Sequence, residues 1–145
     1  LLADENDTGM FVSLFYGILD VNSGVFSYAR AGHNPPYVWN AHDDRFLELC
    51  PQGVVLGIVD DPVFEQDTIE LHKGDTVLFY TDGVIDAINL AQQDFGEERL
   101  KSLLCETTME ESAEELVQRV DSTVRDFSVG TPVFDDFTLV ALKRA

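Results

Sequence analysis

An apolar run that ends in a carboxylate and a glycine constrains the fold of this chain more than any other stretch. Residues 76–81 (TVLFYT) have the composition of a strand buried on both faces, and Asp82 and Gly83 follow directly. A charged side chain at the end of such a strand is costly unless it is paired, solvated or bound to a cation. Asp86 lies four residues beyond Asp82, so a helix that begins at Gly83 lets both carboxylates face one pocket.

The charge of the chain excludes several classes of partner. The 145 residues include 9 Lys and Arg against 27 Asp and Glu, which gives a net charge of −18. We therefore expect neither nucleic acid nor a membrane surface as a partner, because both attract basic proteins. Divalent cations and basic proteins are compatible with this charge, although solubility alone also accounts for an acidic surface.

The length of the apolar runs and the spacing of the cysteines predict where the protein is located and whether its cysteines form a disulfide. No apolar run is long enough to cross a bilayer. Cys50 and Cys105 lie far apart without paired spacing, which predicts free thiols in a reducing cytoplasm.

The apolar pattern changes its period after Asp82, from short β-rich segments between turns to helical spacing. The segments expected to form strands are 10–20, 25–30, 37–39, 45–49, 64–71, 76–81 and 134–142. The expected helices are 83–90, one that opens at 96, and one that carries the apolar stripe to Phe127 after a capping box of Thr108 and Glu111. This order predicts an α+β fold of antiparallel strands and helices in one domain.

Carboxylates occur at the ends of two predicted core strands. Asp82 ends one strand, and Asp135 and Asp136 open the last one. If these strands are antiparallel neighbours, the carboxylates converge and repel each other unless protons or cations intervene. Oxygen ligands of this kind favour Mg²⁺ or Mn²⁺. Composition alone favours the simpler alternative, in which Asp82 caps a helix and Asp135 is solvated.

Other reaction classes find no support in the residues. His33 lies in the loop 32–36 (GHNPP), where an acid–base role and a hydrogen bond to backbone are both open. Ser13 lacks the Gly-x-Ser-x-Gly context of a nucleophile. The glycines have neither P-loop nor dinucleotide spacing, and the Cys and His residues have no zinc spacing.

A series of motifs, taken in order, resembles the bacterial metal-dependent serine/threonine phosphatases of the PPM family. The branch is that of the sporulation stage II protein E and the stress-response sigma-factor regulators. The motifs are MFVSLFYGILD at 10–20, YARAGHNPPY at 28–37, LGI at 56–58, GDT at 74–76, YTDGV at 80–84, FGEERL at 95–100 and DDFTLV at 135–140. One such motif is weak evidence, but the ordered series covers nearly the whole chain.

The resemblance implies an antiparallel β-sandwich flanked by helices, with a two-metal site at one end. Asp82 and Asp135 match metal-binding aspartates of the family. Asp136 and Gly83 fall at outer positions of the site, and Asp86 matches a position that helps to bind a third, weaker metal ion in some relatives. This resemblance overrides the simpler alternative for Asp82 and Asp135.

His33 and Asn34 are expected to line the same site. In some relatives the weaker metal site also uses an Asp at the position that His33 occupies here, so this chain departs from the family's pattern for a third ion.

The mechanism that the resemblance implies is direct hydrolysis by water that two Mn²⁺ or Mg²⁺ ions activate. The implied substrate is phosphoserine or phosphothreonine on an anti-sigma-factor antagonist-type protein in bacterial signalling. An upstream sensor or receiver domain is expected to precede the catalytic domain.

The family's site also uses acidic residues upstream of the first matching motif, which this chain lacks. We therefore expect residues 1–145 to be the C-terminal part of a PPM-type domain that is truncated at its N-terminus, binds metal weakly alone, and has exposed edges that a partner copy in a homodimer could cover. The alternative is a pseudophosphatase, a non-catalytic module of the same fold that only binds a regulator.

Overall fold

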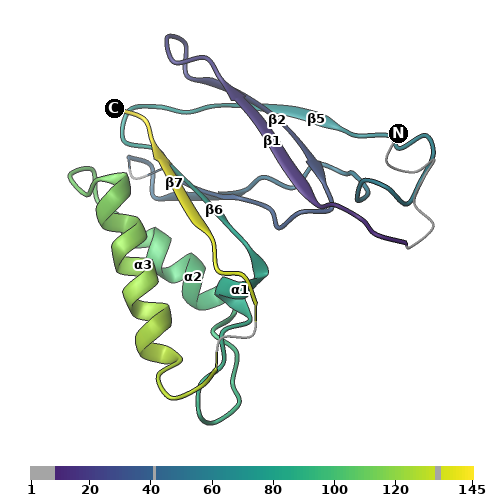
Figure 1. Cartoon of the computed structure of the whole chain (residues 1–145). Coiled ribbons are helices and arrows are strands. Elements are labelled where there is room, and N and C mark those ends of the chain that lie inside the picture. The colour runs from purple at the N-terminus through teal and green to yellow at the C-terminus, as the bar shows by residue number, and fades with distance from the viewer. Residues whose placement is uncertain (1–8, 41, 133–134) are drawn as a thin grey trace. The chain divides into compact units, whose positions relative to one another are not determined.

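The computed structural model describes residues 9–40, 42–132 and 135–145. These residues form two compact units. The first unit takes the described residues up to Pro35 together with Leu49–Leu71, and the second takes Pro36–Glu48 together with His72–Ala145. Each unit contains one antiparallel sheet, and Figure 1 shows the elements of both.

The first unit is built on a three-stranded sheet of order β1-β2-β5. Its strands are β1 (Leu14–Leu19), β2 (Val25–Ala31) and β5 (Gln66–Glu70), all antiparallel. The turn between β1 and β2 is held by the Asp20 side chain, which accepts the backbone N–H groups of Asn22 and Ser23. Such local acceptance by an aspartate is typical of turns, and the predicted hairpin is confirmed.

The second unit contains a four-stranded sheet of order β4-β3-β6-β7. Its strands are β3 (Tyr37–Asn40), β4 (Arg45–Glu48), β6 (Thr76–Tyr80) and β7 (Leu139–Lys143). β6 lies between β3 and β7 in the sheet. Val77 and Leu78 point to opposite faces because successive side chains of a strand alternate, and both are fully buried. The apolar run therefore forms the doubly buried strand that its composition predicts.

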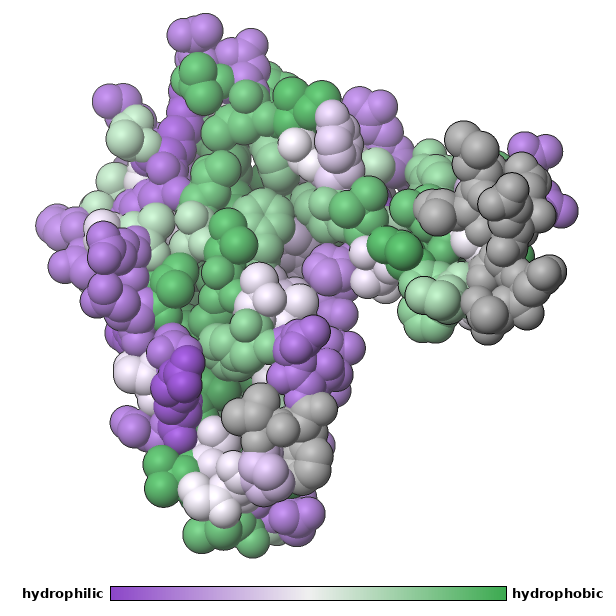
Figure 2. All heavy atoms as spheres, viewed as in Figure 1, coloured by the Kyte–Doolittle hydropathy of each residue, from purple (hydrophilic) through white to green (hydrophobic). Residues whose placement is uncertain are grey.

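Three helices complete the second unit: α1 (Asp82–Ile85), α2 (Gly96–Cys105) and α3 (Ala113–Phe127). Figure 2 shows hydrophilic side chains gathered along the outer side of α3, while its apolar stripe faces inward. The helices and the sheet share one apolar core, whose buried members are Tyr37, Trp39, Leu78, Tyr80, Val84, Phe95, Leu100, Leu104, Leu116, Val120 and Val124.

The first predicted helix is much shorter than expected, and residues 83–90 are not one helix. α1 ends at Ile85 because Asn89 organises a turn instead. The Asn89 side-chain oxygen accepts the backbone N–H groups of Ala91 and Gln93 at 2.9 and 3.1 Å. Asparagine competes with helical hydrogen bonding in this way, and the chain reverses before α2.

The capping box of α3 lies four residues later than predicted. The Ser112 hydroxyl accepts the backbone N–H of Glu115, and the Glu115 carboxylate accepts the backbone N–H of Ser112. Thr108 only accepts the N–H of Glu111, at 3.3 Å, in the preceding turn. The prediction that Thr108 and Glu111 form the capping box was therefore wrong. The Ser/Thr-x-x-Glu spacing occurs twice in succession, first at Thr108 and then at Ser112, and the spacing alone does not distinguish the two.

Other strand boundaries also differ from the expected ones, and β5 covers Gln66–Glu70 rather than 64–71. β1 begins at Leu14 rather than Met10, since Val12 forms only an isolated bridge with Leu56. β7 begins at Leu139, after an irregular segment from Asp135 to Thr138, and the expected strand start at Phe134 lies outside the described residues.

The predicted free thiols are confirmed, since Cys50 and Cys105 are both unpaired and exposed. In the described part of the chain, no helix has the length and apolar character needed to traverse a bilayer.

Candidate metal centre

The pairing of β6 with β7 brings the predicted carboxylates to one end of the sheet. The strands are antiparallel neighbours, and their last paired residues are Tyr80 and Leu139. Asp82 follows β6 and Asp135 precedes β7, so the conditional prediction that these two ends adjoin is confirmed. Directly beyond this pair of strands, Thr81 and Thr138 are hydrogen-bonded although they are 57 positions apart in the sequence.

Thr81 fastens the segment before β7 to the end of β6. Its hydroxyl donates to the backbone carbonyl of Asp136 at 2.7 Å and accepts the backbone N–H of Thr138 at 2.9 Å. The backbone N–H of Thr81 donates to the carbonyl of Thr138 at 3.2 Å. Three hydrogen bonds therefore hold the segment that carries Asp135.

Gly83 permits this close approach. A Cβ atom at this position would lie 2.5 Å from the carbonyl oxygen of Asp136 and 3.3 Å from that of Asp135. Only glycine leaves room for another backbone at such a distance. The Asp-Gly pair thus serves two purposes: the aspartate supplies a carboxylate, and the glycine lets the second carboxylate-bearing segment rest against it.

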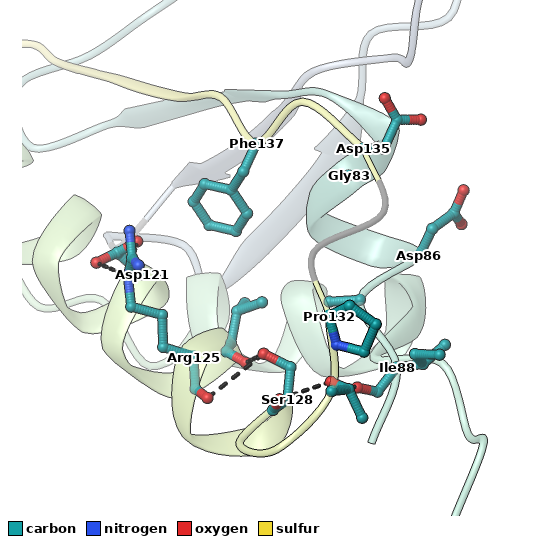
Figure 3. A pocket seen from close by; sticks show the side chains of 12 residues that line it. Gly83, Asp86, Ile88, Asp121, Arg125, Ser128, Pro132, Asp135 and Phe137 are labelled. Atoms are coloured by element: carbon teal, nitrogen blue, oxygen red, sulfur yellow. Dashed lines mark hydrogen bonds and ion pairs between the residues drawn. The ribbon is translucent and has the colours of Figure 1, made fainter. Parts of the chain in front are cut away.

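The carboxylates are exposed and influence one another. One oxygen of Asp82 accepts the N–H of Gly83, and one oxygen of Asp135 accepts the N–H of Asp136. Burial raises the pKa of Asp86, and the negative charges of Asp82, Asp94 and Asp135 raise it further. In Figure 3 the carboxylates of Asp86 and Asp135 point away from the ring of Phe137.

The donor chemistry of this cluster fits a hard divalent cation. Asp82, Asp86 and Asp135 offer only oxygen ligands, and no Lys or Arg of the described ranges forms an ion pair with them. A divalent cation would offset their mutual repulsion. The number of donors falls short, since no group of three or more metal-ligating side chains is in place within the described residues. The residues therefore fit one part of a metal site.

Two further aspartates lie close to the cluster. Asp136 is exposed, and its backbone rather than its side chain holds the segment in place. Asp94 was missed by the sequence reasoning, although its charge reaches Asp86. The turn at Asn89 reverses the chain, so that Ile88 and Asp94 form a bridge. Predicting that Asp94 lies near Asp86 would have required recognising this turn in the sequence.

His33 and Asn34 belong to the first unit, whereas the aspartates belong to the second. Nδ1 of His33 lies 3.0 Å from the Ser13 hydroxyl. Arg30 donates to the carbonyl of His33 at 3.1 Å and to that of Pro51 at 3.2 Å. The loop is thereby anchored within its unit, and the contact of His33 with a hydroxyl differs from the backbone bond that the sequence left open. Asn34 is half-buried.

The comparison with protein families identifies a match along the whole chain. The family model of Stage II sporulation protein E (SpoIIE) matches residues 1–145. The chain is 35% identical over 141 residues to the phosphoserine phosphatase RsbU of Bacillus subtilis (strain 168). This alignment covers 95% of the chain and 40% of RsbU.

Solved structures show the same fold. The SiaA-PP2C domain of Pseudomonas aeruginosa matches with a TM-score of 0.78 at 19% identity, over 92% of this chain and 52% of that domain. The Mn-presoaked phosphatase domain of the cell fate determinant SpoIIE from Bacillus subtilis matches with a TM-score of 0.68 at 16% identity, over 91% of this chain and 56% of that domain. These likenesses confirm the predicted α+β fold of PPM phosphatases, and the chain spans about half the length of these domains.

Proposed function

Because the chain belongs to the Stage II sporulation protein E family, we propose that the protein of which it is part is a metal-dependent serine/threonine phosphatase. Residues 1–145 would form the C-terminal part of its PPM-type domain. The observation that carries the proposal is the meeting of Asp82 and Asp135 at one end of β6 and β7, with Gly83 against the backbone of Asp136. The similarity to RsbU, a phosphoserine phosphatase, supports the same reaction class.

Asp82 and Asp135 would hold Mn²⁺ or Mg²⁺, with Asp86 and Asp136 as neighbouring oxygen groups. When bound, two such ions lower the pKa of a water molecule and stabilise charge on the phosphoryl oxygens. The chain itself contributes position: Thr81 and Gly83 fix the distance between the two carboxylate-bearing segments. The Mn-presoaked structure of the SpoIIE domain supports the choice of metal. Further ligands would come from the rest of the domain.

The substrate we propose is a phosphorylated regulatory protein of the anti-sigma-factor antagonist type, in bacterial signalling. This rests on the likeness to RsbU and to a structure that joins RsbU and RsbW domains of Rv1364c from Mycobacterium tuberculosis. An upstream sensor or receiver domain, a cytoplasmic location, a homodimer and a place for His33 and Asn34 in the site belong to the same proposal.

A second candidate function is a regulator-binding module without catalysis. The observation in its favour is that no group of three metal-ligating side chains is in place among the described residues. Such a pseudophosphatase would lack metal-dependent turnover even when the whole protein is assayed.

One experiment decides between the two functions. The full-length protein is assayed with Mn²⁺ and p-nitrophenyl phosphate, together with Asp82→Asn and Asp135→Asn and a matched control, Asp126→Asn, which changes an exposed aspartate of α3. We expect both site variants to lose at least about 100-fold in kcat/KM, roughly 2.7 kcal/mol of transition-state stabilisation, while the control keeps its activity. Full activity in both site variants would refute the assignment, and absence of turnover in the wild type would favour the module.

A further inference from the structure

A pocket of about 190 Å³ lies in the second unit beside the candidate metal centre (Figure 3). We call it the α1–α3 pocket, because its walls come from α1 and the residues after it, from α3, and from the segment before β7. Gly83, Asp86 and Asp135 line it as well, so the pocket and the carboxylate cluster share a wall. The apolar side chains that line it are Ala87, Ile88, Val124, Pro132 and Phe137.

The hydroxyl groups of this pocket are already engaged within the chain. The Thr131 hydroxyl lies 2.7 Å from the carbonyl of Ile88 and 2.6 Å from that of Ser128. The Ser128 hydroxyl donates to the carbonyl of Val124 at 2.9 Å. Since these groups already have partners, the pocket offers a ligand mainly apolar contact.

Figure 3 places the ring of Phe137 on the inner side of the segment before β7 and the carboxylate of Asp135 on the other side. A ligand group at the carboxylates and an apolar group in the pocket would therefore lie on two sides of one short segment. The size suits a single side chain, because an apolar cavity of about 150 Å³ holds one benzene molecule.

The charge of the chain affects how a phosphorylated protein can be bound. A phosphorylated protein carries negative charge, and the chain has a net charge of −18, so the two repel each other outside the immediate reach of bound cations. Apolar contact does not depend on that charge. The cation among the described lining residues, Arg125, donates through Nε to the carboxylate of Asp121.

We propose that the α1–α3 pocket binds one apolar side chain of the phosphoprotein substrate while the phosphoryl group lies at the carboxylates. This inference rests on the proposed function. Since Asp86 and Asp135 belong to both places and an extended chain advances roughly 3.5 Å per residue, the apolar residue lies roughly one to three positions from the phosphoserine.

The test uses the full-length protein with Mn²⁺ and fluorescein-labelled peptides in an alanine host, in which a non-hydrolysable phosphonate analogue replaces phosphoserine so that turnover does not consume the ligand. Leucine is moved through the three positions on each side of the analogue, and Kd is measured by fluorescence anisotropy. We expect leucine at one position to tighten binding about tenfold or more over alanine. Ser128→Leu fills the pocket and brings this ratio close to one, whereas Ser122→Leu, a matched change on the exposed side of α3, preserves it.

A second filling variant, Ala87→Met, changes a different lining residue of the pocket. A loss of the leucine preference in both variants is therefore not due to misfolding caused by one particular substitution. The proposal is overturned if leucine gives no advantage at any position, or if the advantage survives both filling variants. A leucine preference without any hydrolysis of p-nitrophenyl phosphate would support the pocket and overturn the phosphatase. Hydrolysis without a leucine preference would support the phosphatase and overturn the pocket.

Discussion

Replacing Thr81 by valine tests whether its hydroxyl positions the Asp135 segment. Valine keeps the branched shape but leaves the carbonyl of Asp136 and the N–H of Thr138 without their partner. Each hydrogen bond contributes about 0.5–1.5 kcal/mol. Because Asp136 and Thr138 are exposed, water replaces part of both bonds, which places the total loss at about 1–2 kcal/mol.

This loss should appear in metal affinity. In the variant, the segment before β7 must be ordered when the ion binds, so the free energy of the lost bonds weakens binding by about 5–30-fold, at about 1.4 kcal/mol per factor of ten. The measurement is isothermal titration calorimetry of Mn²⁺ into the full-length protein, with urea unfolding in parallel. Thr81→Ser, which keeps the hydroxyl, should bind Mn²⁺ almost as the wild type does. Equal Mn²⁺ affinity in Thr81→Val and the wild type would refute the positioning argument.

Two further predictions concern stability. Ser112→Ala should lower the free energy of unfolding by about 1 kcal/mol because it removes the side-chain cap of α3, whereas Thr108→Ala should cost less than half as much; equal losses in urea unfolding would contradict the observed capping box. Burial raises the pKa of Asp75 above its ordinary value, so the folded state holds this proton more tightly and loses stability as pH rises from about 4 through the folded pKa. Asp75→Asn should therefore flatten the decline in stability over that range, and an unchanged pH profile in urea unfolding would show that another group titrates.

The sequence predicts the strand β6 and the position of Asp82 because burial on both faces requires an unbroken apolar run, which is a local signal. The adjacency of Asp82 and Asp135 was predicted only on the condition that two strands are antiparallel neighbours, and the pairing of Tyr80 with Leu139 meets it. The three hydrogen bonds of Thr81 could not be predicted, because they join residues 55 and 57 positions apart.

The remaining errors come from side chains that compete with the backbone. Asn89 ends the helical pattern after Ile85 by accepting backbone N–H groups, while the apolar spacing alone continues. For α3, the same Ser/Thr-x-x-Glu spacing begins at both Thr108 and Ser112. In the structure the second forms the cap, and Leu116, which follows Glu115, is fully buried.

On the proposed function, the repulsion within the carboxylate cluster would make the stability of the fold depend on metal. Burial raises the pKa of Asp86, and the charges of Asp82 and Asp135 raise it further. The cluster therefore carries an unfavourable interaction, which the hydrogen bonds of Thr81 and the contact at Gly83 offset. A cation that binds only the folded state removes this repulsion and stabilises the fold by RT ln(1 + [L]/Kd), which is about 2.7 kcal/mol at one hundred times Kd. If the proposed cation binds, the same contacts that bring the carboxylates together would make Asp135, and with it one wall of the α1–α3 pocket, respond to metal.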